Sequence, residues 1–508
     1  MIDYRECGRT RLTGAAPDPS LTIDTHTREI GDEMSDTTRV VIPYESMDPL
    51  AIGATDDESK KHRDTLELDV PTANLVADVR PDEPAAVADA TAAAHDALAS
   101  PVDGPTFAEL LAGAGSVAVI IDNQFRPTPS SKLLPAVFDA VEAAGVGDVR
   151  VCCANGKVFP MSESDTEQKV GPQNLARMEA NGWSFHQNDP QNVDAYTFVG
   201  VSSGGTPVWL LNEVASADLK ITIGQAQANH WGAGGGGKLI LPGVVSDETI
   251  ESNHCAFVTS PQTHYGAYCG PMRSDIDEVA SMCGLDCTMN VILDTHGRVV
   301  DVVFGSHPEA HQEAIRRFNA IYAYDSFVPE HGQVDIAICG VFAPTDHLFF
   351  HTGWGCMSAD LVVKDGGTII YTSPSPGVST AIGDFPGLAL MDLMKPYMPP
   401  TPENYQRVLR DIHAREIQMW AGCIWVPIYE VMTRKHLSIV TLEENLEMAT
   451  DIGLDATTSL DEAFAAAMDR HGADAKVAVL PFARYQLPRN AVRMTGADAH
   501  VFAYSGHS

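Results

Sequence analysis

Basic residues are scarce in this chain of 508 residues. Only 33 lysines and arginines stand against 68 aspartates and glutamates, giving a formal net charge of −35. A surface with this excess of negative charge repels the phosphates of nucleic acid and anionic membranes, so neither is an expected partner. The same excess is typical both of proteins adapted to high salt and of ordinary soluble acidic enzymes, and charge alone does not separate the two.

Long apolar runs and paired cysteine motifs are missing as well. No apolar stretch approaches the ~18 residues of a membrane-spanning helix. Residues 1–14 lack the apolar core of a secretory signal, which makes a cytoplasmic location the default expectation. The ten cysteines form no C-x-x-C pair, so we expect reduced, buried thiols rather than disulfides or a zinc cluster.

What the sequence does contain is a repeated alternation of buried strands and helices. The run SVAVIIDNQ (116–124) is a continuous apolar strand, and KLLPAVFDAVEAAG (132–145) is a helix that ends on glycine. Such alternation is typical of α/β proteins with mostly parallel sheets, and a second series begins near residue 330. We therefore predict two α/β domains with the active site in the cleft between them.

The expected boundaries follow the changes in composition and pattern along the chain. They predict an acidic, flexible N-terminal extension over 1–64, an N-terminal cofactor-binding domain over 65–310, a C-terminal domain over 325–480, and a segment over 481–508 that returns to the N-terminal domain.

A run of four glycines ends in a lysine soon after a predicted strand; it comprises Gly234, Gly235, Gly236, Gly237 and Lys238. Glycines let backbone N–H groups approach an anion closely, and the lysine can pair with phosphate or act as a nucleophilic amine. Because leucine follows the lysine, no hydroxyl is placed for Mg²⁺ as in a P-loop. A surface turn is the alternative, but four consecutive glycines cost backbone entropy, which favours a functional role.

Two further residues are candidates for ligand binding. Arg126 lies in DNQFRPTP at the carboxyl end of a predicted strand, where open α/β sheets bind ligands, and its guanidinium suits a carboxylate or phosphate. His254 follows Lys238 after a Pro-Gly turn and is a candidate metal ligand. The alternatives are a charged loop residue for Arg126 and a structural histidine for His254.

Taken together, these segments resemble the lactate racemase family that depends on a nickel-pincer nucleotide. DNQFRPTP matches the family's D-x-x-R-P loop, GGGGKLILPG matches its glycine-rich loop ending in lysine, and the Asn253–His254 pair matches its metal-binding histidine. The similarity extends over about residues 65–490 and includes ADLVVKDGGTII and VAVLPFARYQLP in the second half.

This resemblance implies a covalent nickel-pincer nucleotide attached to Lys238, with His254 as the protein ligand of nickel. Asn123, Arg126 and the four glycines would then surround the cofactor. The implied reaction is racemisation or epimerisation of a 2-hydroxy acid, in which hydride leaves Cα and returns on the opposite face. Such a reaction requires two acid/base groups and a cation for the carboxylate, and Arg126 matches the family's active-site arginine.

The chain departs from the family where protons are handled. Val158 stands where the family has a catalytic histidine, and Lys157 is the nearest alternative in the pocket. His230, eight residues before Lys238, is the remaining family base. In the second domain, His351 and Trp354 replace a glutamine and a lysine; His351 is a candidate acid/base and Trp354 a candidate pocket wall, although both can also be packing residues.

These departures indicate a 2-hydroxy acid substrate other than lactate. Two alternatives stay open: a homologue that holds the cofactor without racemising a substrate, and an α/β oxidoreductase that binds a nicotinamide nucleotide at the glycine run. The expected partners are the small-molecule substrate and the enzymes that synthesise the cofactor. The sequence does not predict an oligomeric state.

Overall fold

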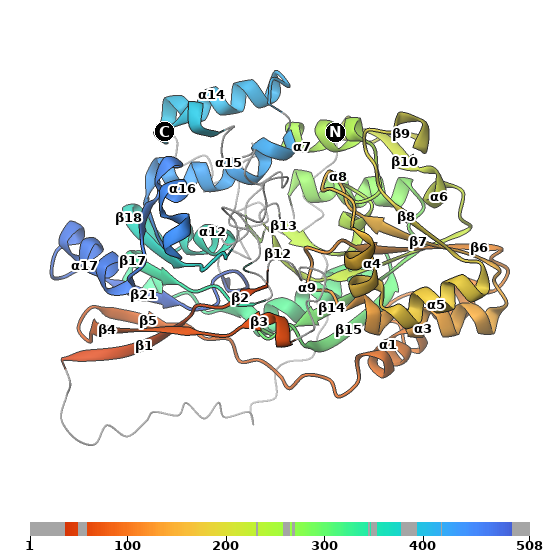
Figure 1. Ribbon diagram of the computed structural model, residues 1–508, viewed down its shortest axis with the longest axis horizontal. Coiled ribbons are helices and arrows are strands. Elements are labelled where there is room, and N and C mark those ends of the chain that lie inside the picture. The colour runs from red at the N-terminus through yellow and green to blue at the C-terminus, as the bar shows by residue number, and fades with distance from the viewer. Residues whose placement is uncertain are drawn as a thin grey trace.

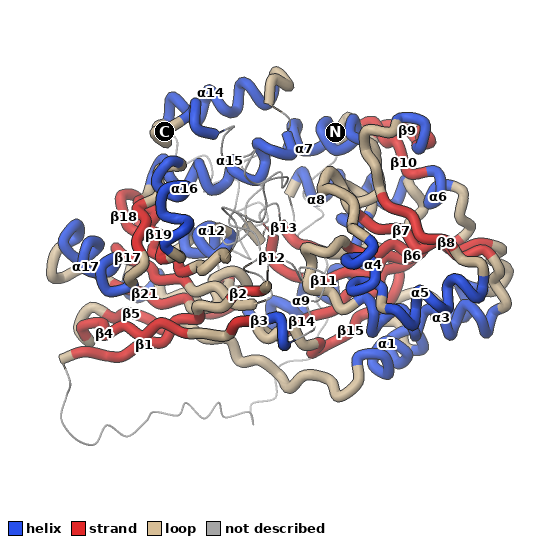
Figure 2. Tube along the Cα trace, in the orientation of Figure 1, coloured by secondary structure: helices blue, strands red, loops and turns tan. Residues whose placement is uncertain are grey.

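The computed structural model describes residues 36–48, 58–229, 232–257, 265–266, 270–343, 346, 353–376, 394–417 and 419–489. Two six-stranded sheets flanked by helices make up most of this part of the chain (Figures 1 and 2). The arrangement confirms the predicted α/β class with mostly parallel sheets.

The first sheet has the order β15-β14-β11-β6-β7-β8, and only its edge strand β15 is antiparallel to its neighbour. Every residue of β6, β11 and β14 is buried, which explains their continuous apolar sequences. The strands are β6 (Ser116–Asp122), β7 (Asp148–Ala154), β8 (Ser184–Gln187), β11 (Leu219–Gln225), β14 (Cys287–Leu293) and β15 (Val299–Ser306).

The second sheet has the order β20-β19-β18-β17-β21-β5 and is parallel throughout. It lies beside the first sheet on the left of Figure 1. Its strands are β5 (Leu75–Asp78), β17 (Val334–Cys339), β18 (Val363–Thr372), β19 (His436–Val440), β20 (Asp455–Thr457) and β21 (Val477–Leu480).

Five two-stranded pairs complete the strands, each joining neighbouring segments or the chain's two halves. They are β1 (Thr37–Pro43) with β4 (Thr65–Pro71), β2 (Ser46–Met47) with β3 (Lys61–His62), β9 (Tyr196–Val201) with β10 (Pro207–Leu211), β12 (Gln227–Asn229) with β13 (Gly232–Gly234), and β16 (Ala323–Tyr324) with β22 (Leu487–Pro488).

The helices begin and end at recognisable caps. Asp89 accepts hydrogen bonds from the first turn of α1, and α3 ends at Gly145, whose φ of 73° is left-handed. The α-helices with the first sheet are α1 (Ala90–Ala99), α2 (Phe107–Leu111), α3 (Ser130–Ala144), α4 (Glu163–Val170), α5 (Pro172–Asn181), α6 (Asn212–Ala215), α7 (Asp247–Phe257), α8 (Pro271–Met282) and α9 (Glu309–Tyr322).

The later helices are α10 (Val328–His331), α12 (Trp354–Asp360), α14 (Pro402–His413), α15 (Met419–Arg434), α16 (Leu446–Asp451) and α17 (Leu460–His471). Single 3-10 turns are η1 (Glu58–Lys60), η2 (Val193–Ala195), η3 (Gly236–Leu239), η4 (Lys395–Tyr397) and η5 (Glu443–Asn445). In Figure 1, α14 and α15 lie along the top beside α7, and both contact that helix. Elements of the second half therefore pack directly against the helix that carries His254.

The N-terminal boundaries differ from the sequence prediction. Residues 37–43 and 65–71, which we assigned to an extension and to the N-terminal domain, form the β1–β4 hairpin against α17 and the second sheet. Strand β5 extends the second sheet, with Leu75 opposite Val477. Alternation in sequence identifies a strand but not the sheet it joins, and an edge strand this short carries no signal for its partner.

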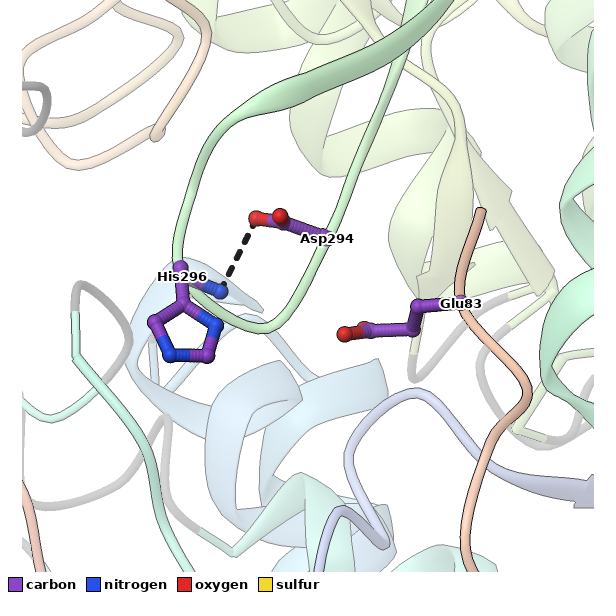
Figure 3. Close-up of side chains that lie close together, drawn as sticks. All are labelled: Glu83, Asp294 and His296. Carbon is purple, nitrogen blue, oxygen red and sulfur yellow. Dashed lines mark hydrogen bonds between the residues drawn. The ribbon is translucent and has the colours of Figure 1, made fainter. Parts of the chain in front are cut away.

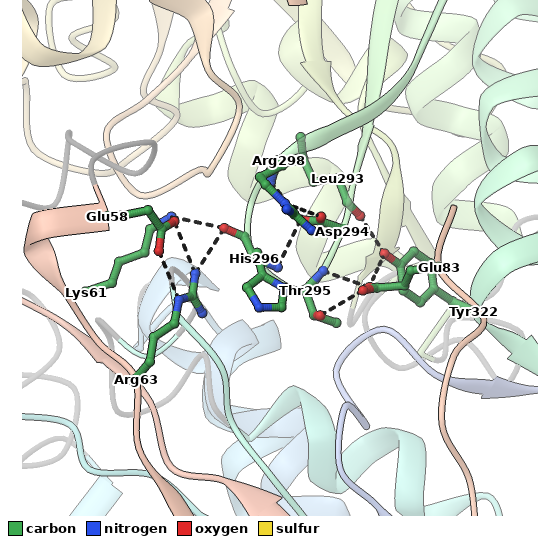
Figure 4. Close-up of polar contacts among 10 residues, drawn as sticks. All are labelled: Glu58, Lys61, Arg63, Glu83, Leu293, Asp294, Thr295, His296, Arg298 and Tyr322. Atoms are coloured by element: carbon green, nitrogen blue, oxygen red, sulfur yellow. Dashed lines mark hydrogen bonds and ion pairs between the residues drawn. The ribbon is translucent and has the colours of Figure 1, made fainter. Parts of the chain in front are cut away.

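A half-buried carboxylate fixes the connection between the two sheets. Glu83 lies between β5 and α1, and it accepts hydrogen bonds from the backbone N–H (2.7 Å) and hydroxyl (3.0 Å) of Thr295, in the turn between β14 and β15. The hydroxyl of Tyr322 donates a third, at 2.8 Å. Three donors to one carboxylate hold this crossing segment on the first sheet (Figure 4).

Asp294 and His296 of that turn approach the same carboxylate closely enough to suggest a metal site (Figure 3). However, Asp294 already forms an ion pair with Arg298 at 2.7 Å. Lys61 and Arg63 both donate to the backbone carbonyl of His296, at 3.0 and 3.2 Å (Figure 4). Because cations already satisfy or surround these acceptors, we interpret the cluster as a clamp between elements of both sheets.

Within the described part of the chain, no helix combines the length and apolar character needed to cross a membrane. The described cysteines are all buried and none forms a disulfide; they are Cys152, Cys153, Cys255, Cys283, Cys287, Cys339 and Cys356. Burial raises the pKa of the Cys255 thiol to about 11, so it stays protonated near neutral pH.

Candidate functional site

The loop after β6 presents buried polar groups at the carboxyl end of the first sheet. Asn123 accepts the backbone N–H of Phe125 at 3.1 Å, which gives it a structural role in the turn. Both amide atoms of Gln124 and the Nη1 of Arg126 are buried without hydrogen-bond partners among the described residues. Natural proteins rarely leave such groups unsatisfied, so this loop faces a position that a ligand would fill.

The glycine run lies against polar side chains of β14 and α9. A Cβ on Gly235 would lie 2.8 Å from Oδ1 of Asn290, and one on Gly236 would lie 2.7 Å from Cγ of His311. Both glycines also have left-handed backbones, with φ of 86° and 55°. Close packing on the protein itself therefore requires glycine at these two positions. The run leads into η3, which carries Lys238.

Two buried residues hold this loop in place. His311 lies 2.7 Å from the carbonyl of Gly234 through its Nε2, and Arg273 lies 3.2 Å from its Nδ1. The Gly234 carbonyl can only accept a hydrogen bond and the Arg273 guanidinium can only donate one. In His311, therefore, Nε2 donates and Nδ1 accepts. Arg273 also donates to the carbonyls of Ala233 (3.1 Å) and Gly235 (3.4 Å). The sequence analysis missed both residues, because their function is to position the loop.

Lys238 lies close enough to His254 for its charge to act on that imidazole. Lys238 donates from Nζ to Oδ1 of Asn229 at 3.1 Å. His254 lies in α7, is 2% exposed, and contacts the carbonyl of Ile250 through Nδ1 at 3.1 Å. That contact requires Nδ1 to carry the proton, which leaves the lone pair on Nε2. Burial, reinforced by the charge of Lys238, lowers the pKa of His254 to about 3.

Lys157 serves helix α7 rather than an open pocket. Its amine forms ion pairs with Asp247, at 2.5 Å, and with Glu251, both on α7. The side chains of Lys157 and Glu251 are 5% and 7% exposed and form a buried ion pair, whereas Asp247 is 33% exposed. The neighbouring Val158, in the position of the family's histidine, offers no proton-transfer group.

Side chains from the second half of the chain meet Arg126. Trp354 is 1% exposed at the start of α12, and the guanidinium carbons of Arg126 and Arg484 lie 5.9 and 4.5 Å from its ring centroid. Tyr265 lies edge-on to the same ring at 6.5 Å and donates from its hydroxyl to the carbonyl of Arg484. Trp354 therefore packs next to Arg126, and its role as a pocket wall stays a prediction.

Three further positions bear on the sequence-based site: two histidines that were predicted and one arginine that was not. His230 and His351, the predicted acid/base residues, lie outside the described residues. Arg484 was not singled out, although it follows β21 at the carboxyl end of a parallel strand, the same kind of position that identified Arg126. A buried arginine directly after an apolar strand was the available signal.

Comparison with known proteins shows similarity to lactate racemases. Residues 62–266 match the lactate racemase N-terminal domain. The lactate racemase of Lactiplantibacillus plantarum is 25% identical over 396 residues, which span 76% of this chain and 87% of that protein. The chain is thus similar to lactate racemases over most of its length. The lactate racemase of Thermoanaerobacterium thermosaccharolyticum is 24% identical over 281 residues, or 54% of this chain and 64% of the relative.

Solved structures share the fold of this chain. The lactate racemase apoprotein from Thermoanaerobacterium thermosaccharolyticum superposes with a TM-score of 0.76 at 20% identity, covering 89% of this chain and 100% of that structure. A Thermotoga maritima protein superposes with a TM-score of 0.57 at 15% identity, covering 78% and 97%. The architecture thus extends across both sheets.

Proposed function

We propose that this protein is a racemase or epimerase of a 2-hydroxy acid other than lactate, acting through a nickel-pincer nucleotide attached to Lys238. The observation that carries the proposal is the pairing of Lys238 with a neutral, buried His254. Curated relatives are lactate racemases, which supports racemase chemistry in general. The site lies where elements of both sheets meet.

The residues present fit such a cofactor. A neutral imidazole with its lone pair on Nε2 is a suitable ligand for nickel, and the bond to the Ile250 carbonyl fixes the ring orientation. A lysine amine is the nucleophile that a thioacid carbon requires. Unsatisfied buried atoms of Gln124, Gln225 and Asn253 indicate polar groups that a ligand would complete. When bound, the nucleotide supplies a hydride acceptor and donor for the substrate Cα.

The protein's own groups then bind and orient the substrate. Arg126, whose Nη1 is available, holds the substrate carboxylate with charge-assisted hydrogen bonds. His230 and His351 are proposed to exchange the proton of the 2-hydroxyl, one on each face. Trp354, standing where the family has a lysine, changes the wall next to Arg126 and supports a substrate different from lactate.

A second candidate rests on Val158. Because valine cannot transfer a proton, the protein could hold the cofactor without racemising a substrate. Conversion of a Cα-deuterated 2-hydroxy acid into its opposite stereoisomer by the loaded enzyme, with the deuterium kept at Cα, would rule out this alternative. The proposed partners are the enzymes that synthesise the cofactor and deliver it to Lys238.

The test is to produce the chain together with the cofactor-synthesis enzymes and to measure its intact mass and nickel content. We expect a covalent adduct that is absent in Lys238→Ala and retained in Lys132→Ala, a matched exposed lysine. His254→Ala should keep the adduct and lose nickel. An unmodified Lys238 under conditions that load a known lactate racemase would refute the cofactor assignment. Saturable binding of NAD(P) in place of an adduct would favour an oxidoreductase.

A further inference from the structure

Two arginines from different halves of the chain share one buried tryptophan. Arg126 follows β6 in the first sheet and Arg484 follows β21 in the second, and their guanidinium carbons lie 5.9 and 4.5 Å from the centre of the Trp354 ring. Each can gain a cation–π contact from this ring. The arrangement places two permanent positive charges on one buried ring.

The backbone around Arg484 is fixed on several sides. Ala483 donates to the carbonyl of Leu480 at 3.1 Å, and Tyr485 donates to that of Phe482 at 2.8 Å, so the segment forms a tight turn after β21. The hydroxyl of Tyr485 in turn accepts from Nε2 of Gln225, at the end of β11, at 2.8 Å. Arg484 is therefore presented to the first sheet by a rigid turn, as binding residues require.

The carboxylate near Arg126 is already engaged. Asp122 pairs with Lys169 at 2.7 Å and accepts the hydroxyl of Thr128. Lys169 also donates to the carbonyl of Arg126 at 2.8 Å, which fixes that backbone. The Nη1 of Arg126 is left without a partner in the described part of the chain. Burial, followed by the charge of Arg484, lowers the pKa of Arg126 to about 10, the direction expected for two close cations.

Two neighbouring buried cations are stabilised best by a ligand that brings two negative charges. We propose that Arg126 and Arg484 form a paired anion site across Trp354, and that the substrate is a 2-hydroxy acid with a second carboxylate. Arg126 holds the carboxylate next to the reacting carbon, and Arg484 holds the distal one. Arg484 thereby determines specificity. This inference rests on the proposed function for the reacting end of the substrate.

The phosphate of the nucleotide is the other anion that Arg484 can bind. Binding measurements on the cofactor-free chain distinguish a substrate carboxylate from this phosphate. The full-length chain without cofactor is titrated with malate, lactate and inorganic phosphate by calorimetry. We expect malate to bind at least about tenfold more tightly than lactate, because a charge-assisted bond contributes this much. Arg484→Gln should abolish that preference while changing lactate affinity by less than about twofold.

Arg484→Lys retains the charge without the planar fork, and it should keep part of the preference for malate even if the glutamine variant folds poorly. Arg489→Gln is the matched control, since Arg489 lies five residues further along and pairs with Asp325 at 3.0 Å on the surface. Its affinities should match the wild type.

Equal wild-type affinities for malate and lactate would overturn the proposal, as would an equal loss of both ligands in Arg484→Gln. A loss restricted to phosphate would assign Arg484 to the nucleotide instead. If malate binds as expected but the loaded enzyme does not interconvert the two malate enantiomers, the proposed racemase function fails while the paired anion site stands.

Discussion

Two structural features can require glycine in the glycine run: a left-handed backbone, and neighbouring atoms that leave no room for a Cβ. Alanine substitutions can separate the two. Gly236 has both features: its φ is 55°, and atoms of His311 lie where a Cβ would be placed. Gly237 lacks the left-handed backbone, but a Cβ there would lie 3.0 Å from that of Ala280. Gly145 has φ of 73° and no atom within 4 Å, and Gly147 has neither constraint. Alanine at each position gives a factorial series.

The expected changes in unfolding free energy combine two losses and one gain. Placing alanine in a left-handed conformation costs about 1–2 kcal/mol of stability, and overpacking a rigid core costs about 1–3 kcal/mol. Replacing glycine by alanine also reduces the entropy of the unfolded chain, which stabilises the folded state by about 0.4–1 kcal/mol. Gly147→Ala should therefore be neutral or slightly stabilising, and Gly145→Ala should lose about 1 kcal/mol. Gly237→Ala should lose about 1–3 kcal/mol and Gly236→Ala about 2–5 kcal/mol.

His311 cannot move away at little cost in Gly236→Ala, because it bonds both the Gly234 carbonyl and Arg273. The assay is urea unfolding followed by circular dichroism, with the midpoint of the first transition compared across the series, since a chain this large can unfold in several steps. If Gly236→Ala is no less stable than Gly145→Ala, packing against His311 is not what requires glycine, and contact with a ligand becomes the better explanation.

Two further variants test the surroundings of the site. Lys157→Met leaves Asp247 and Glu251 without their cation and should lower the free energy of unfolding by about 3–5 kcal/mol, with Lys157→Arg losing less; urea midpoints for both variants check this. Asp346 is fully buried, and burial raises its pKa to about 6, so folding takes up a proton between pH 4 and 6. Stability from this group is therefore present at low pH and is lost as pH rises through about 6, by at most about 3 kcal/mol. The difference in unfolding free energy between wild type and Asp346→Asn, measured from pH 4 to 8, should show this slope; a flat difference would contradict it.

Much of the first sheet could be predicted because its central strands are buried on both faces. Strands such as β6 and β11 read as uninterrupted apolar runs, and the sequence assigned both correctly. The β5 strand shows the limit of this reasoning. Its membership of the second sheet depends on long-range pairing, such as Leu75 with Val477, which local patterns do not encode.

The candidate site could be predicted where a residue's type and position both indicate chemistry. Arg126 lies at the end of a strand, and Lys238 follows an unusual run of glycines, so each stood out without a structure. Arg484 also follows the carboxyl end of a parallel strand, but it was not singled out because the residues before it are apolar. Arg273 and His311 could not be identified, because their role is to hold the carbonyls of Gly234 and Gly235, and that becomes visible only in three dimensions.

Helix α7 shows why prediction fails at the site itself. The sequence analysis assigned no helix to TIESNHCAF, because its polar residues do not alternate with an apolar face. In the structure Glu251, Asn253 and His254 are all buried, at 5%, 0% and 2% exposure, bonded to Lys157, Asp275 and the Ile250 carbonyl respectively. A helix that buries polar residues departs from the usual amphipathic pattern and loses free energy through the desolvation of those residues. Packing alone does not require this loss, because apolar side chains could fill the same positions. That violation, next to Lys238, is itself an argument that α7 is maintained for binding rather than for stability.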